Sequence, residues 1–125
     1  MGEMQNWSCK KCGYTKQLPD GCGMNGLNLR LIKKIFQEDE IREFLWALEE
    51  KKVTIYLLKQ EIGYCDTCKD YMSIPVLEYT LHEGNKIIVR KACSTCGSEI
   101  NVHARKEKCP KCNGELEKKK IGLWD

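Results

Sequence analysis

Residues 27–50 contain two stretches in which apolar side chains recur at the three- and four-residue spacing of an amphipathic helix. Asn25 or Asn28 is placed to cap the first stretch, and Asp39 is placed to cap the second. The pattern therefore predicts two helices joined near residues 37–39. Their apolar positions are Leu27, Leu31, Ile32, Ile35 and Phe36 in the first helix, and Ile41, Phe44, Leu45 and Leu48 in the second.

From Val53 the apolar period changes to two, which predicts a strand running toward Cys65. Pro75 opens a further strand. The turn at residues 83–85 reads Glu-Gly-Asn and separates two short apolar runs, at residues 76–82 and 86–91, so we expect a β hairpin there. The glycine-rich residues 13–26 predict turns around at most one short hairpin.

The chain has nine cysteines, and eight of them form four C-x-x-C knuckles, with Cys22 left over. A C-x-x-C turn holds two sulfurs at the separation of two corners of a metal tetrahedron, so two knuckles can complete a four-sulfur site. Thiolates with no histidine nearby favour zinc, with iron as second choice. We therefore expect two Zn²⁺ ions per chain. The expected ligands are Cys9, Cys12, Cys65, Cys68, Cys93, Cys96, Cys109 and Cys112.

Sequence distance suggests which knuckles share a metal. The last two knuckles read C-x2-C-x12-C-x2-C, close to the usual spacing of a four-cysteine zinc site. The first two knuckles would then pair across residues 13–64, a loop long enough to contain the helical pair, because closure entropy grows slowly with loop length. The main alternative is an interleaved arrangement of first with third knuckle and second with fourth. We expect the sequential arrangement.

The segment 86–121, with knuckles Cys-Ser-Thr-Cys-Gly and Cys-Pro-Lys-Cys-Asn-Gly between expected strands, resembles a zinc ribbon. The N-terminal Cys-Lys-Lys-Cys-Gly-Tyr is similar to the first iron-binding knuckle of rubredoxins, although rubredoxins have far fewer residues between their knuckles. Together with the predicted helices, strands and knuckles, this resemblance leads us to expect a small α+β fold with zinc-ribbon-type β hairpins, two four-cysteine zinc sites and an inserted pair of helices. It implies no particular activity, because fold does not fix function.

The chain is 125 residues long, a length that fits one domain or two very small ones. We expect a zinc-knuckle unit with the helical pair over residues 1–73 and a β hairpin plus ribbon over residues 74–125, able to pack as one body. No apolar run approaches the roughly 18 residues of a membrane span. The first residues lack the pattern of a secretory signal, so we expect a cytoplasmic protein without membrane partners.

Four thiolates close a zinc site, whereas a catalytic zinc keeps an open position. His82 and His103 lie far apart in the sequence, and no phosphate loop or nucleophile motif is present. We therefore expect a protein that is not an enzyme: a zinc-stabilised module that binds a protein partner. Trp46 is expected to pack in the core, and Leu123-Trp124 to fold back onto the domain.

Nucleic acid is the alternative partner, because basic residues are concentrated toward the C-terminus. The residues proposed for it are Arg90, Lys91, Arg105, Lys106 and Lys108. The whole chain is less basic than it looks. Each Zn²⁺ with four thiolates carries a charge of −2, so two sites lower the formal net charge from +3 to −1. A rubredoxin-like iron electron carrier is a more distant alternative.

Overall fold

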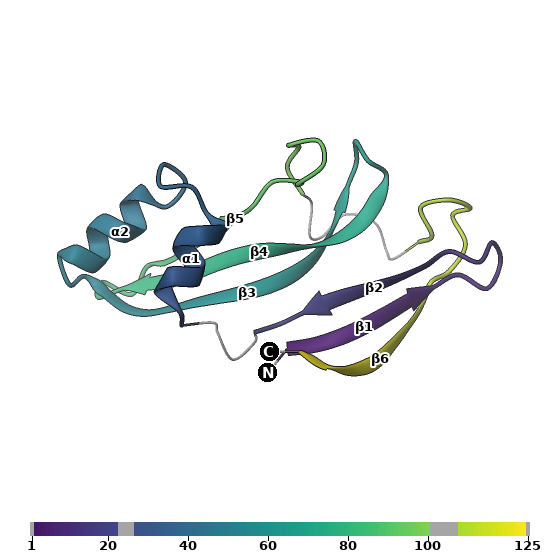
Figure 1. Ribbon diagram of the computed structural model, residues 1–125, viewed down its shortest axis with the longest axis horizontal. Coiled ribbons are helices and arrows are strands. Elements are labelled where there is room, and N and C mark those ends of the chain that lie inside the picture. Colours follow the sequence, from purple (N-terminus) through teal and green to yellow (C-terminus); the bar gives the residue numbers. More distant parts are fainter. Residues whose placement is uncertain (1, 23–26, 101–107, 125) are drawn as a thin grey trace.

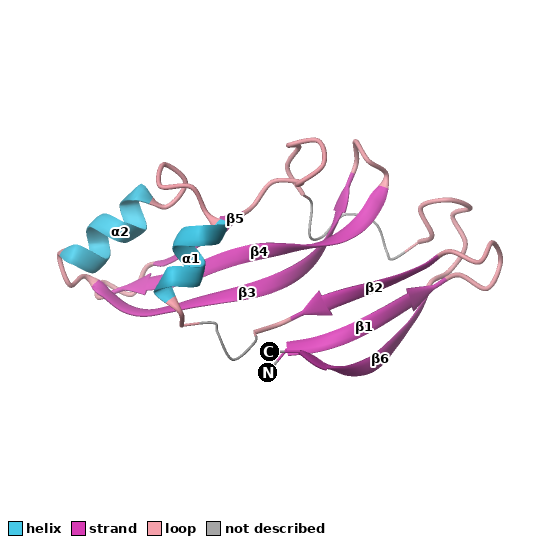
Figure 2. Cartoon of the chain, viewed as in Figure 1, coloured by secondary structure: helices cyan, strands magenta, loops and turns pink. Residues whose placement is uncertain are grey.

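The computed structural model describes residues 2–22, 27–100 and 108–124. Within them the chain is mostly antiparallel β with two helices (Figures 1 and 2). Two three-stranded sheets form, one with strand order β2-β1-β6 and the other with order β3-β4-β5. The elements are β1 (Gly2–Ser8), β2 (Thr15–Asp20), α1 (Leu29–Ile35), α2 (Arg42–Glu49), β3 (Val53–Cys65), β4 (Asp70–Leu81), β5 (Lys86–Arg90) and β6 (Glu117–Trp124).

The main core lies between the two helices and one face of the β3-β4-β5 sheet (Figure 1). Leu58 and Leu77 are cross-strand partners on this face, and both are buried. Phe44 of α2 is fully buried and stacks edge-on against Tyr56 of β3. The predicted helix pair therefore does cover a sheet, because its apolar face needs a partner surface. The buried members are Ile32, Phe36, Ile41, Phe44, Leu58, Leu77 and Tyr79.

The helix starts agree only in part with the sequence. Asn28 caps α1, and its side-chain oxygen accepts hydrogen bonds from the backbone N–H groups of Arg30 and Leu31. The expected cap at Asp39 is wrong: the N-cap of α2 is Ile41, and no side chain caps it. Trp46 is also not in the core, since it is 53% exposed on α2. It lies two positions from buried Phe44, which on a helix points to the opposite side.

The strands and hairpin expected from period-two patterning form. β3 runs from Val53 to Cys65, and the turn at Gly84 separates β4 from β5. β4 begins earlier than expected, at Asp70 rather than at Pro75, because it pairs with β3 all the way to the second knuckle. The division of the chain at residues 73 and 74, which falls inside β4, stays a prediction. Neither helix has the length and apolar composition needed to cross a membrane.

The second sheet joins the two ends of the described chain. β1 pairs with β2 on one side and with β6 on the other, which places the N- and C-terminal ends close together (Figure 1). The expected fold-back of the C-terminal residues is thus present in the backbone, where Gly2 pairs with Trp124. Polar residues dominate residues 2–8, so their strand was not apparent from the sequence.

The two sheets meet at the end of the β3-β4 hairpin that the helices leave uncovered (Figure 1). Trp7 of β1 packs edge-on against Tyr71 of β4, with their ring centroids 4.9 Å apart. Leu18 and Tyr64 complete this buried cluster. Backbone hydrogen bonds between Gly21 and Gln60 join the sheets a second time. This contact brings the knuckles at 9–12 and 65–68 to the same part of the molecule.

Candidate metal centres

The four knuckles, at residues 9–12, 65–68, 93–96 and 109–112, have the same backbone conformation. In each one, the N–H of the residue after the second cysteine donates to the carbonyl oxygen of the first cysteine, at 2.7–3.0 Å. This bond closes a tight turn and keeps both sulfurs on one side of it. The four bonds are Gly13 to Cys9, Lys69 to Cys65, Gly97 to Cys93, and Asn113 to Cys109.

The residue that closes each turn has a positive φ. Gly13 and Gly97 have φ of 80° and 76°, which glycine adopts without steric cost. Asn113 has φ of 61°, a conformation that asparagine tolerates. Lys69, with φ of 54°, is the exception, because it takes the left-handed conformation with a long side chain. A positive φ at this position is thus common to all four knuckles, including the one that has neither glycine nor asparagine there.

The structure brings the eight knuckle cysteines together as two clusters, nested in the sequence. The outer tetrad joins the first knuckle to the fourth, and the inner tetrad joins the second to the third. The expected sequential pairing is therefore wrong, and so is the interleaved alternative. The outer tetrad is Cys9, Cys12, Cys109 and Cys112, and the inner tetrad is Cys65, Cys68, Cys93 and Cys96.

The physical reason for the nested pairing lies in the strands that carry the knuckles. β6 follows the fourth knuckle and pairs with β1, which leads into the first, with Ser8 opposite Glu117. The second knuckle is the turn between β3 and β4, and β5 leads from β4 to the third. The strands that flank the expected ribbon, β5 and β6, belong to different sheets. The zinc-ribbon architecture of residues 86–121 is therefore not confirmed.

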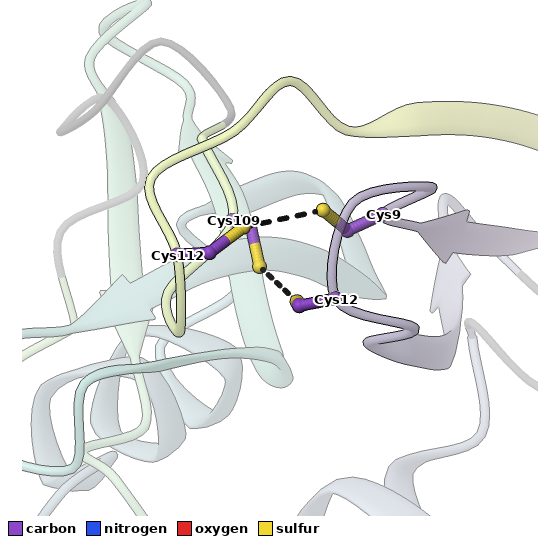
Figure 3. A group of neighbouring side chains, drawn as sticks. All are labelled: Cys9, Cys12, Cys109 and Cys112. Atoms are coloured by element: carbon purple, nitrogen blue, oxygen red, sulfur yellow. Dashed lines mark hydrogen bonds between the residues drawn. The ribbon is translucent and has the colours of Figure 1, made fainter.

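The sulfur positions suit a tetrahedral metal ion. All four ligand atoms of each tetrad lie within 4.8 Å of one another. The Sγ atoms of Cys9 and Cys112 are 3.4 Å apart (Figure 3). Those of Cys65 and Cys96 are 3.5 Å apart. A tetrahedron with Zn–S bonds of about 2.3 Å has edges of about 3.8 Å, whereas a disulfide needs about 2 Å. Both tetrads could therefore hold a metal ion.

Each tetrad is buried on one side and exposed on the other. The first cysteine of every knuckle is buried, with at most 3% of its surface exposed. The second cysteine is exposed in three knuckles and half-buried at Cys68. Tyr14 packs against Cys9 and Cys109, so the outer tetrad has an aromatic wall. The buried sulfurs make each cluster part of the fold, while the exposed ones leave a path for metal to enter.

Hydrogen bonds within and beside the tetrads shift the thiol pKa values in opposite directions. The pKa of Cys96 is lowered to about 6 because the side chain and backbone of Ser98 donate to its sulfur. The pKa of Cys9 is lowered to about 7, chiefly by a backbone hydrogen bond from Cys12. Hydrogen bonding to Cys96 and Cys93 instead raises the pKa of Cys68 to about 12. Each cluster therefore combines thiolate with thiol, and a divalent cation would displace the remaining protons.

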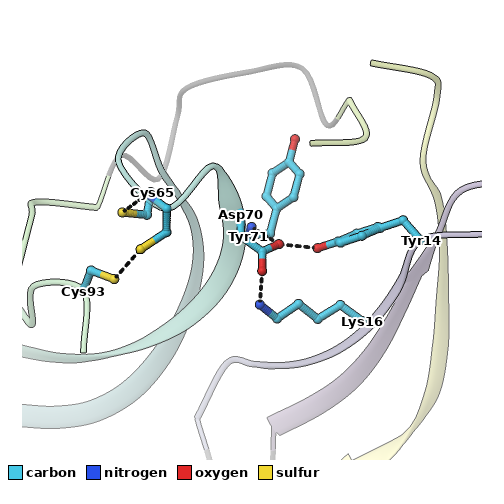
Figure 4. A network of polar contacts seen from close by, with 7 residues as sticks. Tyr14, Lys16, Cys65, Asp70, Tyr71 and Cys93 are labelled. Carbon is cyan, nitrogen blue, oxygen red and sulfur yellow. Dashed lines mark hydrogen bonds and ion pairs between the residues drawn. The ribbon is translucent and has the colours of Figure 1, made fainter. Parts of the chain in front are cut away.

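A polar network connects the neighbourhoods of the two tetrads (Figure 4). Asp70 accepts hydrogen bonds from the Tyr14 hydroxyl at 2.6 Å and from the Lys16 ammonium at 2.8 Å. The Tyr71 hydroxyl donates to the carbonyl oxygen of Lys108 at 2.9 Å. These contacts were not predicted from the sequence. The available signal was position, because Tyr14, Asp70 and Lys108 each lie within two residues of a knuckle.

The basic residues proposed for nucleic acid lie in different surroundings. Arg90 pairs with Glu61 at 3.0 Å, and Lys91 pairs with Glu40 at 2.7 Å. Lys108 lies next to the outer tetrad, and its backbone forms an isolated antiparallel β-bridge with Glu115. Arg105, Lys106 and His103 lie outside the described residues. His82 is exposed at the β4-β5 turn, and Cys22, partly exposed, belongs to neither tetrad.

Comparison of the chain with protein-family models, with curated proteins and with solved structures returned no match.

Proposed function

We propose that this protein is a non-catalytic zinc protein in which two structural Zn²⁺ ions, one in each tetrad, hold a protein-interaction module in shape. The observation that carries the proposal is the pair of four-sulfur clusters whose spacing suits a tetrahedral ion. In the part of the chain that the structure describes, neither cluster includes a histidine or carboxylate. Four thiolates saturate zinc and leave no position for a reacting water.

The position of the tetrads also supports a structural role. The outer tetrad ties the first hairpin to the segment before β6, and the inner tetrad ties the β3-β4 turn to the segment after β5. Zinc binding to such a site contributes on the order of 10 kcal/mol to folding. In a chain of 125 residues with two small cores, this contribution is large compared with typical net stability.

Metal counting on paired variants tests both the sites and their nested pairing. Wild-type protein purified anaerobically should hold two zinc ions. The double variant Cys12→Ser/Cys112→Ser removes two ligands of one tetrad and should keep one ion. The double variant Cys12→Ser/Cys68→Ser damages both tetrads and should keep none. The reverse result for the two variants would contradict the nested pairing, and wild-type protein well short of two equivalents would contradict the proposal.

Visible absorption separates zinc from iron, because iron-thiolate sites are coloured and zinc sites are colourless. We expect colourless protein. An intense visible band that scales with iron content would instead favour the rubredoxin-like alternative.

A protein partner is supported by large apolar side chains on the surface of the helical side. Trp46 on α2 is 53% exposed, with the Lys52 ammonium 4.4 Å from its ring centroid. Leu27, which precedes α1, is also more than half exposed. Tryptophan is enriched at protein interfaces and among the residues that carry most of the binding energy.

Capture from a lysate of the source cells, with and without nuclease, tests the class of partner. We expect the wild-type protein to capture a partner protein that stays bound after nuclease treatment. The Trp46→Ala variant should no longer capture it. Ile121→Ala is the matched control, because Ile121 is exposed on β6 in the other sheet. Loss of all captured material on nuclease treatment would favour the nucleic-acid alternative.

A further inference from the structure

Asp70 and Tyr71 form a connector between the two tetrads. The connector begins two residues after Cys68 of the inner tetrad. Asp70 hydrogen-bonds Tyr14, which follows the first knuckle and packs on Cys9 and Cys109. Tyr71 hydrogen-bonds the carbonyl of Lys108, which precedes the fourth knuckle. Two adjacent residues at the start of β4, just after the second knuckle, therefore contact residues that flank both knuckles of the outer tetrad.

The connector is well packed and makes further contacts. Tyr71 is 3% exposed and lies against Trp7 and Tyr64. The Asp70 carboxylate also accepts hydrogen bonds from the Lys16 ammonium and from the backbone N–H of Tyr71. This carboxylate therefore has a defined orientation, and moving it would disturb several hydrogen bonds at once.

The inner tetrad has the better-supported frame. β3 and β4 pair continuously down to the second knuckle, where Cys65 lies opposite Asp70. The Thr67 and Ser98 hydroxyls, 2.9 Å apart, join the second and third knuckles directly. The outer tetrad instead closes a loop over residues 13–108, which contains the whole inner unit. Closing the longer loop costs more entropy unless other contacts have already shortened it.

We propose that the Asp70-Tyr71 connector makes the two centres bind metal cooperatively and in order, with the inner tetrad first. This inference rests on the proposed zinc function. Metal at the inner tetrad holds the second knuckle and the start of β4, and so places the Asp70 carboxylate and the Tyr71 hydroxyl. These groups then hold the first and fourth knuckles close together. By linkage, metal at the outer tetrad strengthens binding at the inner one to the same extent.

Native mass spectrometry of the full chain with one molar equivalent of zinc measures the coupling. Two independent, equal sites would leave about half of the molecules with one ion, and unequal sites would leave more. We expect the wild type to be mainly metal-free or doubly loaded. In Tyr71→Phe and Asp70→Ala the singly loaded fraction should rise. In the combined variant, affinity for the second zinc should fall by about 5- to 150-fold.

Matched controls separate the connector from general effects on folding. Tyr56→Phe removes a similar tyrosine hydroxyl, which donates to the Leu27 carbonyl away from both tetrads. Glu78→Gln removes a carboxylate that pairs with Lys59 and Lys86. Both controls should retain the wild-type distribution. If Asp70→Ala does not fold with two equivalents of zinc, Tyr71→Phe carries the test alone, since it removes one oxygen atom.

Alkylation of the singly loaded species in Tyr71→Phe identifies which tetrad loads first, and we expect label on the outer cysteines. Label mainly on the inner cysteines would overturn the order. A wild type in which half or more of the molecules carry one ion would overturn the coupling and leave the zinc function intact. An unchanged distribution in both connector variants, or an equal rise in Tyr56→Phe, would overturn the connector's role. Failure of wild-type protein to bind two ions would instead overturn the proposed function.

Discussion

At the residue scale, the closing position of each knuckle shows how one backbone requirement selects residue types. Three knuckles meet it with Gly13, Gly97 or Asn113, and the second uses Lys69. A non-glycine residue in the left-handed region costs about 1 kcal/mol or more. The second knuckle tolerates this cost because it is also the turn of the long β3-β4 hairpin, which supplies compensating hydrogen bonds.

Replacing Lys69 with glycine should therefore stabilise the protein by about 1 kcal/mol, since glycine removes the strain at φ of 54°. Denaturant unfolding of the zinc-loaded protein measures the change. The comparison variant is Lys34→Gly inside α1, where glycine should destabilise by about 1 kcal/mol. A destabilised Lys69→Gly protein would show that the lysine side chain contributes more than its backbone conformation costs.

The thiol pKa values predict how metal binding depends on pH. Near neutral pH, Cys96 is already ionised because its pKa is about 6, whereas Cys68, with a pKa of about 12, still carries a proton that zinc must displace. Below about pH 6 the proton on Cys96 must be displaced as well. As the pH is lowered further, the logarithm of the zinc affinity of the inner tetrad should therefore decrease more steeply. The slope should be larger by about one proton per zinc ion.

Calorimetry of zinc binding in buffers with different ionisation enthalpies measures the protons released. We expect fewer than four per site near neutral pH, and more at lower pH. A proton count that does not change with pH would contradict this prediction.

At the element scale, the helices are stable because their apolar faces pack on the β3-β4-β5 sheet. α1 has only seven residues, too few to be stable alone, and Ile32 is its one fully buried member. Its N-terminal end is nevertheless well defined, because the Asn28 side chain accepts hydrogen bonds from two backbone N–H groups. α2 has no side-chain cap and depends on Phe44 and Ala47, which pack into the core.

Asn28→Ala should destabilise the protein by about 1 kcal/mol, because two N–H groups of α1 lose their acceptor. Asn6→Ala in β1 should have a smaller effect, since the Asn6 side chain accepts a single weak hydrogen bond, from the Thr15 hydroxyl at 3.2 Å. Thermal unfolding of the zinc-loaded variants measures both, and equal losses would mean that the cap does not matter.

Leu77→Ala should cost about 2–5 kcal/mol, because Leu77 is fully buried between the helices and the sheet. Ile55→Ala, on the neighbouring strand and 63% exposed, should change stability by less than about 0.5 kcal/mol. Chemical denaturation distinguishes the two, and similar effects would show that the core is not where the structure places it.

At the scale of the whole molecule, each tetrad is associated with one of the two sheets. The inner tetrad, the β3-β4-β5 sheet and the helices form a continuous unit within residues 27–100. The outer tetrad and the β2-β1-β6 sheet close the remaining segments of the described chain around one end of it. Ion pairs add to the same surface, where Lys120 reaches Glu3 across β6 and β1 at 3.3 Å.

Cys112→Ser should therefore loosen the terminal sheet while leaving the central hairpin intact. Hydrogen exchange should become faster in β6 and β1 but stay slow in the middle of β3 and β4, where the core is buried. Cys22→Ser, which changes a cysteine outside both tetrads, should not alter exchange in β6. Equal acceleration across both sheets would mean that the fold opens as a single unit.

Short-range features were predictable, and long-range partners were not. The helices around Ile32 and Phe44, the strand at Val53–Cys65 and the turn at Gly84 follow from periodicity and turn chemistry, which act over a few residues. Trp46 was expected in the core and Asp39 was expected to cap α2. Both predictions were wrong, because these features depend on how the helix docks. β1 was missed because a polar strand between two neighbours needs no apolar pattern.

The four equivalent knuckles follow from the spacing of eight cysteines, because a knuckle is a local turn specified by its own few residues. Which knuckles meet depends on the three-dimensional fold. The choice depends on β6 returning to β1 and on β5 continuing the β3-β4 hairpin. The same long-range contacts placed Arg90 and Lys91 in ion pairs with Glu61 and Glu40. Sequence spacing favours near neighbours, but strand pairing gains its free energy from whole strands, and in this chain it outweighs proximity along the chain.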